Sequence, residues 1–184
     1  APTVESILRI RGQSGKAVRS VTICGLTLAV ANTPLVAGGF GAGKFPGAVE
    51  LTQAEDCRLV DLEIKNVGGQ GIRAWKLKSC VIEGCHVHDT GACGLKFGGE
   101  CVVRNNHVHH VGRIYPSGIA VWGGGRDRQT CHIELNTIHD TPYTAIACGG
   151  VISGASRSSA APQAAGSAAH GRSASRRPAS FRSA

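Results

Sequence analysis

The hydrophobic positions of this chain recur as a repeat of similar copies. Each copy starts with an apolar residue, carries aliphatic residues at offsets +2 and +7, and then has a small residue followed by an aliphatic one. Four copies begin at Cys57, Cys80, Cys101 and Cys131, and an earlier copy begins at Val21. A spacing of roughly 22 residues with three apolar pairs per copy is typical of one coil of a solenoid.

Each coil is therefore expected to hold three short strands, and each strand to pair with its equivalent in the next coil about 4.8 Å away. Leu59, Ile82, Val103 and Ile133 share offset +2 and should form one buried column. A leucine-rich repeat would need regular leucines and helical segments, which are absent from this pattern. The sequence predicts an all-β fold, a parallel β-helix of about five coils.

Two columns of polar or sulfur-containing side chains follow from the same register. Asn106 and Asn136 share an offset at a bend and should hydrogen-bond to each other. The cysteines that open four of the copies are expected to be small packing residues, because bridges between neighbouring parallel strands have awkward geometry.

Composition changes abruptly near residue 150. The last 34 residues contain 24 Ala, Ser or Arg, so we expect residues 1–150 to form the β-helix domain and 151–184 to be a disordered tail. The break also predicts a truncated or frameshifted fragment whose β-helix is incomplete at its C-terminal end. Oligomers are expected only through that exposed solenoid end.

The net charge of +8 is concentrated in this tail, which holds five arginines and no acidic residue. The remaining surplus of +3 is too small to indicate a nucleic-acid partner. No apolar run approaches the ~20 residues of a membrane span.

The third strand of each coil carries the candidate ligand-binding surface. The outward residues just after the aliphatic position are predicted to be Glu50, Arg73, Lys96, Ala120 and Ala147. Two residues further on, the predicted row contains Trp75 and Trp122, two coils apart, and flat indoles suit the apolar faces of sugar rings. The alternative is an ordinary salt-bridged face with two partly buried tryptophans. The predicted substrate-binding residues are Glu50, Arg73, Trp75, Lys96 and Trp122, with Arg113 and Tyr115 from the longer third copy.

Histidines and aspartates gather at the turn after the second strand. Asp89 and Asp140 follow histidines at one offset, two coils apart, which suits an inverting acid/base pair with carboxyls ~6.5–9.5 Å apart. The alternative is a hydrogen-bonding role at the turn. A zinc or copper ion could bridge two or three of His86, His88, His107 and His109, but the columns are regular rather than convergent and no carboxylate or cysteine is assigned to a matching offset. We therefore expect no metal and no cofactor.

Three segments carry a resemblance to a known family: Asn136–Tyr143, Tyr115–Ile119 and Ser20–Pro34. They resemble secreted right-handed β-helix carbohydrate-active enzymes, and are most similar to the glycoside hydrolases that include fucosidases and xylanases. The resemblance implies a right-handed solenoid, a secreted or periplasmic location and a polysaccharide substrate. Relatives continue past Gly149 with further coils and an acidic segment, so the activity is expected of the parent protein and this chain alone is expected to be inactive.

The resulting prediction is a fragment of a secreted polysaccharide-degrading glycoside hydrolase. Two alternatives stay open. One is a polysaccharide lyase, in which Arg73 or Lys96 would remove the proton α to a uronate carboxylate. The other is a noncatalytic carbohydrate-binding or adhesive β-helix.

Overall fold

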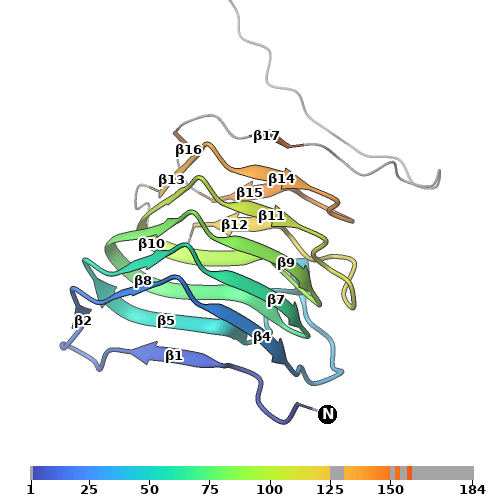
Figure 1. Cartoon of the computed structure of the whole chain (residues 1–184), viewed down its shortest axis with the longest axis horizontal. Helices are drawn as coiled ribbons and strands as arrows, with labels where there is room; N and C mark the ends of the chain where they lie inside the picture. The colour runs from blue at the N-terminus through green and yellow to red at the C-terminus, as the bar shows by residue number, and fades with distance from the viewer. Residues whose placement is uncertain (1, 125–130, 150–151, 154–156, 159–184) are drawn as a thin grey trace, which may run out of the picture.

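The computed structural model describes residues 2–124, 131–149, 152–153 and 157–158, and these residues form a stack of coils whose named strands pair in parallel (Figure 1). The predicted parallel β-helix is confirmed. Each coil contributes to three faces, named here by their place in the coil. The first face contains β1 (Leu8–Arg11), β5 (Gly47–Glu55), the first halves of β8 (Gln70–Glu83) and β10 (Leu95–Arg104), β12 (Val121–Gly123) and β15 (Ile146–Cys148).

The other two faces continue each coil. The second face contains β3 (Thr22–Cys24), β6 (Arg58–Val60), the second halves of β8 and β10, β13 (Cys131–Glu134) and β16 (Ile152–Ser153); β2 (Val18–Arg19) pairs with the end of β5. The third face contains β4 (Thr27–Ala31), β7 (Glu63–Val67), β9 (His86–Thr90), β11 (His107–His109), β14 (Thr137–His139) and β17 (Arg157–Ser158). Because every coil adds one strand to each face, side chains at equal offsets are placed in rows along the stack.

The core lies inside the coils, where the predicted column is confirmed. Leu59, Ile82, Val103 and Ile133 pair strand to strand and are each at most 1% exposed. The cysteine column is buried beside it, and all eight cysteines are free thiols. Removing these apolar side chains from water is the main contribution to the stability of the coil.

The corners of the coil are made by residues with left-handed backbone angles. Between the second and third faces these are Asp61, Gly84, Asn105 and Leu135, and between the third and first faces they are Asn66, Asp89, His110 and Asp140. Asn and Asp tolerate positive φ better than most residues, which explains their frequency at these two offsets. The positive φ angles at these corners therefore explain the presence of Asp89 and Asp140 on structural grounds.

The asparagine column is also confirmed. The Asn136 side-chain oxygen accepts hydrogen bonds from the Asn106 side-chain nitrogen at 2.9 Å and from the Asn106 backbone N–H at 3.0 Å. The Asn106 oxygen in turn accepts from the Cys85 backbone N–H. The ladder satisfies buried polar groups at the bends next to these two asparagines.

One predicted register is wrong. In the copy that begins at Cys101, the third strand was expected to open at Ile119, but Leu95 pairs with Val121, two residues later. Ala120 consequently takes the buried small-residue position before the aliphatic Val121, instead of the outward position after the aliphatic residue, and Trp122 lies next to Lys96. The loop before β12 is longer than its counterparts, and a shift of two residues leaves the inward and outward alternation unchanged.

The solenoid also extends beyond the predicted copies at both ends. Strand β1 pairs with β5 before the first expected copy. Strands β16 and β17 pair with β13 and β14 beyond the predicted boundary at residue 150. The rest of the tail that was expected to be disordered lies outside the described residues.

An insertion between β4 and β5, residues 32–46, departs from the coil and contains one short 3₁₀ helix, η1 (Phe40–Ala42). The Phe45 ring stacks on Tyr115 with centroids 4.1 Å apart, and the Tyr115 hydroxyl donates to the Pro34 carbonyl. The insertion thus packs against coils that are much later in the sequence. Among the described residues, no helix has the length and hydrophobicity required to cross a bilayer.

Candidate functional site

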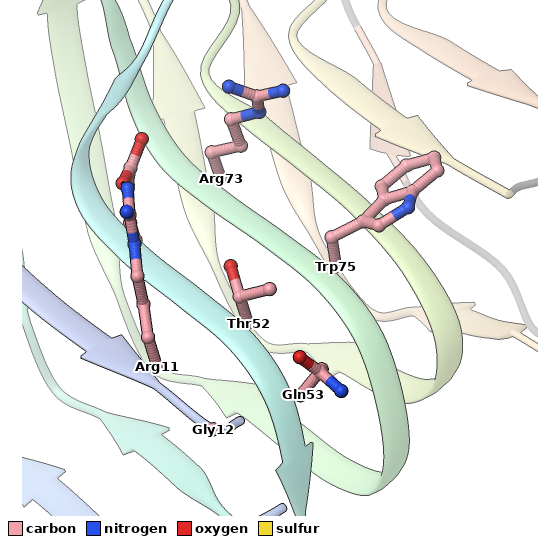
Figure 2. A pocket seen from close by; sticks show the side chains of 7 residues that line it. Arg11, Gly12, Thr52, Gln53, Arg73 and Trp75 are labelled. Carbon is pink, nitrogen blue, oxygen red and sulfur yellow. The ribbon is translucent and has the colours of Figure 1, made fainter. Parts of the chain in front are cut away.

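An open groove of about 380 Å³ lies on the first face, over β1, β5 and β8 (Figure 2). Arg73 and Trp75 rise from the same strand, because residues two apart on β8 point to the same side. The residues that line the groove are Arg11, Gly12, Glu50, Thr52, Gln53, Arg73 and Trp75. Three predicted substrate-binding residues, Glu50, Arg73 and Trp75, are therefore brought together.

The groove carries an excess of positive charge. Glu50 is only 5% exposed, and its carboxylate accepts a hydrogen bond from the Arg11 guanidinium and lies 3.4 Å from the Arg9 Nε atom. Arg73 pairs in register with Glu50, yet no carboxylate in the described part of the chain lies within ion-pair distance of its guanidinium. A cation without an acidic partner on the groove floor favours an anionic ligand.

Trp75 forms an exposed flat surface at one side of the groove. The residue is 38% exposed, and its indole extends over the backbone of the next coil at Gly98. A Cβ atom at Gly98 would lie 2.7 Å from the indole, so the ring fits here because position 98 has no side chain. An exposed indole over open backbone is a suitable platform for a sugar ring.

Lys96 and Trp122 do not belong to this open surface. The Lys96 Nζ atom donates to the Gly43 carbonyl at 2.8 Å, and the Trp122 ring contacts Phe40 edge to face with centroids 5.8 Å apart. Both side chains therefore hold the insertion against the first face. Burial lowers the pKa of Lys96, since the ammonium group loses contact with water.

Trp75 and Trp122 both project from the first face, but they occupy different rows. Trp75 pairs with Thr52 and Gly98, whereas Trp122 pairs with Lys96 and Ala147. The predicted row of two indoles beside two cations is therefore wrong in its register. Trp75 with Arg73 is the part of the predicted platform that remains.

Arg113 and Tyr115 are on the loop that follows β11, outside the residues that line the groove. Tyr115 is engaged with the insertion through its ring and hydroxyl, and Arg113 is exposed. Their predicted contact with substrate stays a prediction.

Asp89 and Asp140 lie at the corner after the third face, and neither lines the groove. Each accepts a 2.8 Å hydrogen bond from the Nδ1 atom of the preceding histidine, His88 or His139. These hydrogen bonds lower the pKa of both aspartates. A lowered pKa keeps a carboxylate ionised and suits a base, whereas a general acid needs a raised pKa. Their predicted acid/base role stays a prediction.

The third face carries a compact array of imidazoles on β9, β11 and β14. The Nε2 atoms of His86 and His109 are 2.8 Å apart, and those of His107 and His139 are 2.7 Å apart. Stacked pairs continue across the strands, with His86 over His107 and His88 over His109. Burial, followed by the neighbouring imidazoles, lowers the pKa of His109 to about 4. The His109 ring is therefore neutral near pH 7.

Sequence reasoning missed two groups of residues. Arg9 and Arg11 alternate with Leu8 and Ile10, a strand pattern before the first expected copy that indicated β1. Glu63 has the same offset as His86 and pairs with it in register, so a carboxylate does stand at a matching offset beside the histidines. Both signals were present in the sequence.

Comparison with known proteins agrees with the architecture. The family model described as the right-handed beta helix region matches residues 43–159, which is more than half of the chain. No curated protein and no solved structure gives a significant match. The repeat, the parallel coils and this match together show that the chain belongs to the right-handed β-helix family.

Proposed function

We propose that this β-helix binds an acidic polysaccharide along its first face, with a uronate unit in the groove between Arg11, Arg73 and Trp75. The observation that carries the proposal is the Arg73 guanidinium, which lacks a carboxylate partner among the described residues and stands beside the exposed indole of Trp75. A guanidinium can hold a carboxylate through two parallel hydrogen bonds, and an indole can stack on the same sugar ring.

Charge supports an anionic ligand over a neutral one. Among the described residues, the groove and its edge hold Arg9, Arg11 and Arg73, against one carboxylate, that of Glu50. Because Glu50 is buried and already paired with two of these arginines, it leaves Arg73 free for the ligand. The open shape of the groove suits a chain that continues along the coils. We propose that binding takes place outside the cytoplasm, as the carbohydrate-active resemblance implies.

A second candidate function is cleavage of the bound chain by β-elimination. Lys96 pairs in register with Arg73, and burial lowers the pKa of its ammonium group, which raises the fraction of neutral amine. Lys96 is outside the groove lining, so its amine would first have to leave the Gly43 carbonyl and turn toward Arg73. The amine would take the proton α to the uronate carboxylate. The electron pair of that C–H bond would form a double bond as the β-linked glycosidic oxygen leaves.

Hydrolysis, the activity expected from the resemblance, has less support from this groove. A hydrolase of the usual kind needs two carboxyl groups flanking the scissile bond, and the described lining residues include only Glu50. The aspartate pair lies at another corner of the coil. Hydrolysis therefore ranks below binding and elimination.

Binding is tested by calorimetric titration of the full chain with oligogalacturonate and with neutral xylo-oligosaccharides of equal length. We expect Arg73→Met and Trp75→Ala each to weaken oligogalacturonate binding by about tenfold or more, since each contact is worth roughly 1–3 kcal/mol. Lys76→Met is the matched control, because Lys76 is an exposed neighbour of Trp75 outside the groove. Equal affinity for the two ligands, or variants as tight as the control, would contradict the proposal.

Turnover is tested separately on polygalacturonate and xylan. Elimination gives an unsaturated uronate that absorbs in the ultraviolet together with reducing ends, whereas hydrolysis gives reducing ends alone. Lys96→Arg keeps the positive charge but not the lowered pKa, so it should abolish elimination while binding persists. Reducing ends without ultraviolet absorption would favour hydrolysis, and binding without products would leave a binding module.

A further inference from the structure

The histidine array on the third face satisfies the geometry of a metal site that is separate from the glycan groove. His107 and His109 are two residues apart on β11 and point outward, and His86 faces them from the adjacent strand β9. One ring nitrogen from each of the three lies within 4.8 Å of the others. Two imidazoles from one strand and a third from its neighbour can converge on one ion.

We propose that His86, His107 and His109 bind one divalent transition-metal ion of the zinc and copper class. Imidazole nitrogens are favoured ligands of these ions, and three histidines with an open fourth position form a known zinc arrangement. The His86 and His109 Nε2 atoms are 2.8 Å apart, a distance at which one nitrogen carries a proton that the lone pair of the other accepts. An ion would replace that proton after a small outward movement of the rings.

The surroundings orient further nitrogen atoms toward the array. Asp140 accepts a hydrogen bond from His139 Nδ1, which leaves the His139 Nε2 atom 2.7 Å from His107 Nε2. His139 is not one of the three ligands, so its contact with His107 has to open when the His107 Nε2 atom loses its proton and binds the ion. Parallel strands hold all these side chains on rigid backbone, so little ordering is needed when an ion binds.

A neighbouring group of Glu63, His86 and His88 offers a competing position one coil earlier. The His88 Nε2 atom is buried and has no hydrogen-bond partner within the described structure. However, both Glu63 carboxylate oxygens are engaged, one by Lys65 Nζ and one by Thr27 Oγ1, each at 2.9 Å. An ion there would have to displace an ion pair and a hydroxyl contact of Glu63, whereas at the three-histidine position it displaces only contacts between imidazoles, so the three-histidine position is favoured.

The test uses the full chain after treatment with a chelator, titrated with zinc chloride in competition with a chromophoric chelator. We expect one zinc ion per chain and an increase in Tm. His107→Asn and His109→Asn should each weaken zinc binding by at least about tenfold, since even outer-shell changes cost about 10–100-fold. His132→Asn is the matched control, because His132 lies on β13 in the second face.

Cobalt substitution gives a second readout, since intense visible absorption bands report a four-coordinate site in the wild-type chain. No zinc binding, or binding that survives both β11 variants, would overturn the proposal. Binding lost with His88→Asn and Glu63→Gln, but kept with His107→Asn, would place the ion one coil earlier and also overturn it. The glycan proposal is tested separately by oligogalacturonate titration, because the zinc outcomes concern the third face and the groove lies on the first face.

Discussion

The Lys96 ammonium group lies 4.0 Å from the centroid of the Trp122 ring and donates to the Gly43 carbonyl. This pair joins two neighbouring coils to the insertion that follows β4. A cation over an indole contributes about 0.5–2 kcal/mol, and a hydrogen bond from a charged donor contributes about 1.5–3 kcal/mol. The pair therefore holds the insertion in place.

Lys96→Met keeps the apolar stem but removes the charge and the donor. We expect the free energy of unfolding to fall by about 1–3 kcal/mol, measured by urea denaturation, because Gly43 loses its partner and the cation–π contact disappears. Lys78→Met is the control, since Lys78 forms an exposed ion pair with Glu55 and its loss should change stability less than the loss of Lys96. Equal stability of the two variants would show that the insertion does not depend on this contact.

Gly98→Ala tests whether Trp75 needs open backbone beneath its ring. The new Cβ would lie 2.7 Å from the indole, and the ring, being exposed, should move away at little cost. We expect a change in stability below about 1 kcal/mol but a clear loss of oligogalacturonate affinity, because the platform is displaced. The measurement is titration beside a urea melt. Unchanged affinity would show that the position of the Trp75 ring does not affect oligogalacturonate binding.

Asn136→Ala tests the buried ladder. The variant removes the oxygen that accepts from both the side chain and the backbone of Asn106, and leaves two buried donors without that partner. Each orphaned donor costs about 1–3 kcal/mol, so we expect at least about 2 kcal/mol of destabilisation in urea. Thr137→Ala is the control, because Thr137 is the next residue in the chain and is exposed. A loss no greater than that of the control would mean that the ladder is replaceable by water.

The buried thiols predict a loss of stability at alkaline pH. Burial raises the pKa of Cys85 and of Cys131 to about 11, from an ordinary value of 9.0. A raised folded-state pKa contributes stability that is complete below pH 9 and is lost as the pH rises toward 11, because only the unfolded chain then ionises readily. Urea midpoints should fall over this interval, and less so in Cys85→Ala. A Cys85→Ala variant with the same slope as the wild type would contradict this origin.

Thiol labelling checks the same burial at pH 8. Cys24 is exposed and should react first, whereas the column at Cys57, Cys80 and Cys101 should react only after unfolding. Rapid modification of the column in the folded chain would contradict the packing described here.

The repeat by itself determined the solenoid, its three strands per coil and the buried columns. Leu59 and Ile82 could be aligned from spacing alone, because stacking equal offsets is the only arrangement that buries every copy. The same spacing placed His88 and His109 side by side, as the paired strands β9 and β11 show. The spacing also aligned Glu63 with His86, and the alternation of Leu8 to Arg11 indicated β1; neither was included in the sequence prediction.

Only the tertiary structure decided the row of Trp122 and the composition of the groove. Two successive small–aliphatic pairs, Gly118-Ile119 and Ala120-Val121, stand at the start of β12. Either pair fits the inward and outward alternation of the strand, because the two pairs differ by two residues. The choice depends on backbone pairing with β10, which no local pattern reports. In the same way, the contacts of Lys96 with Gly43 and of Tyr115 with Pro34 join residues far apart in the chain. They exist only once the coils are stacked and the insertion is folded across them.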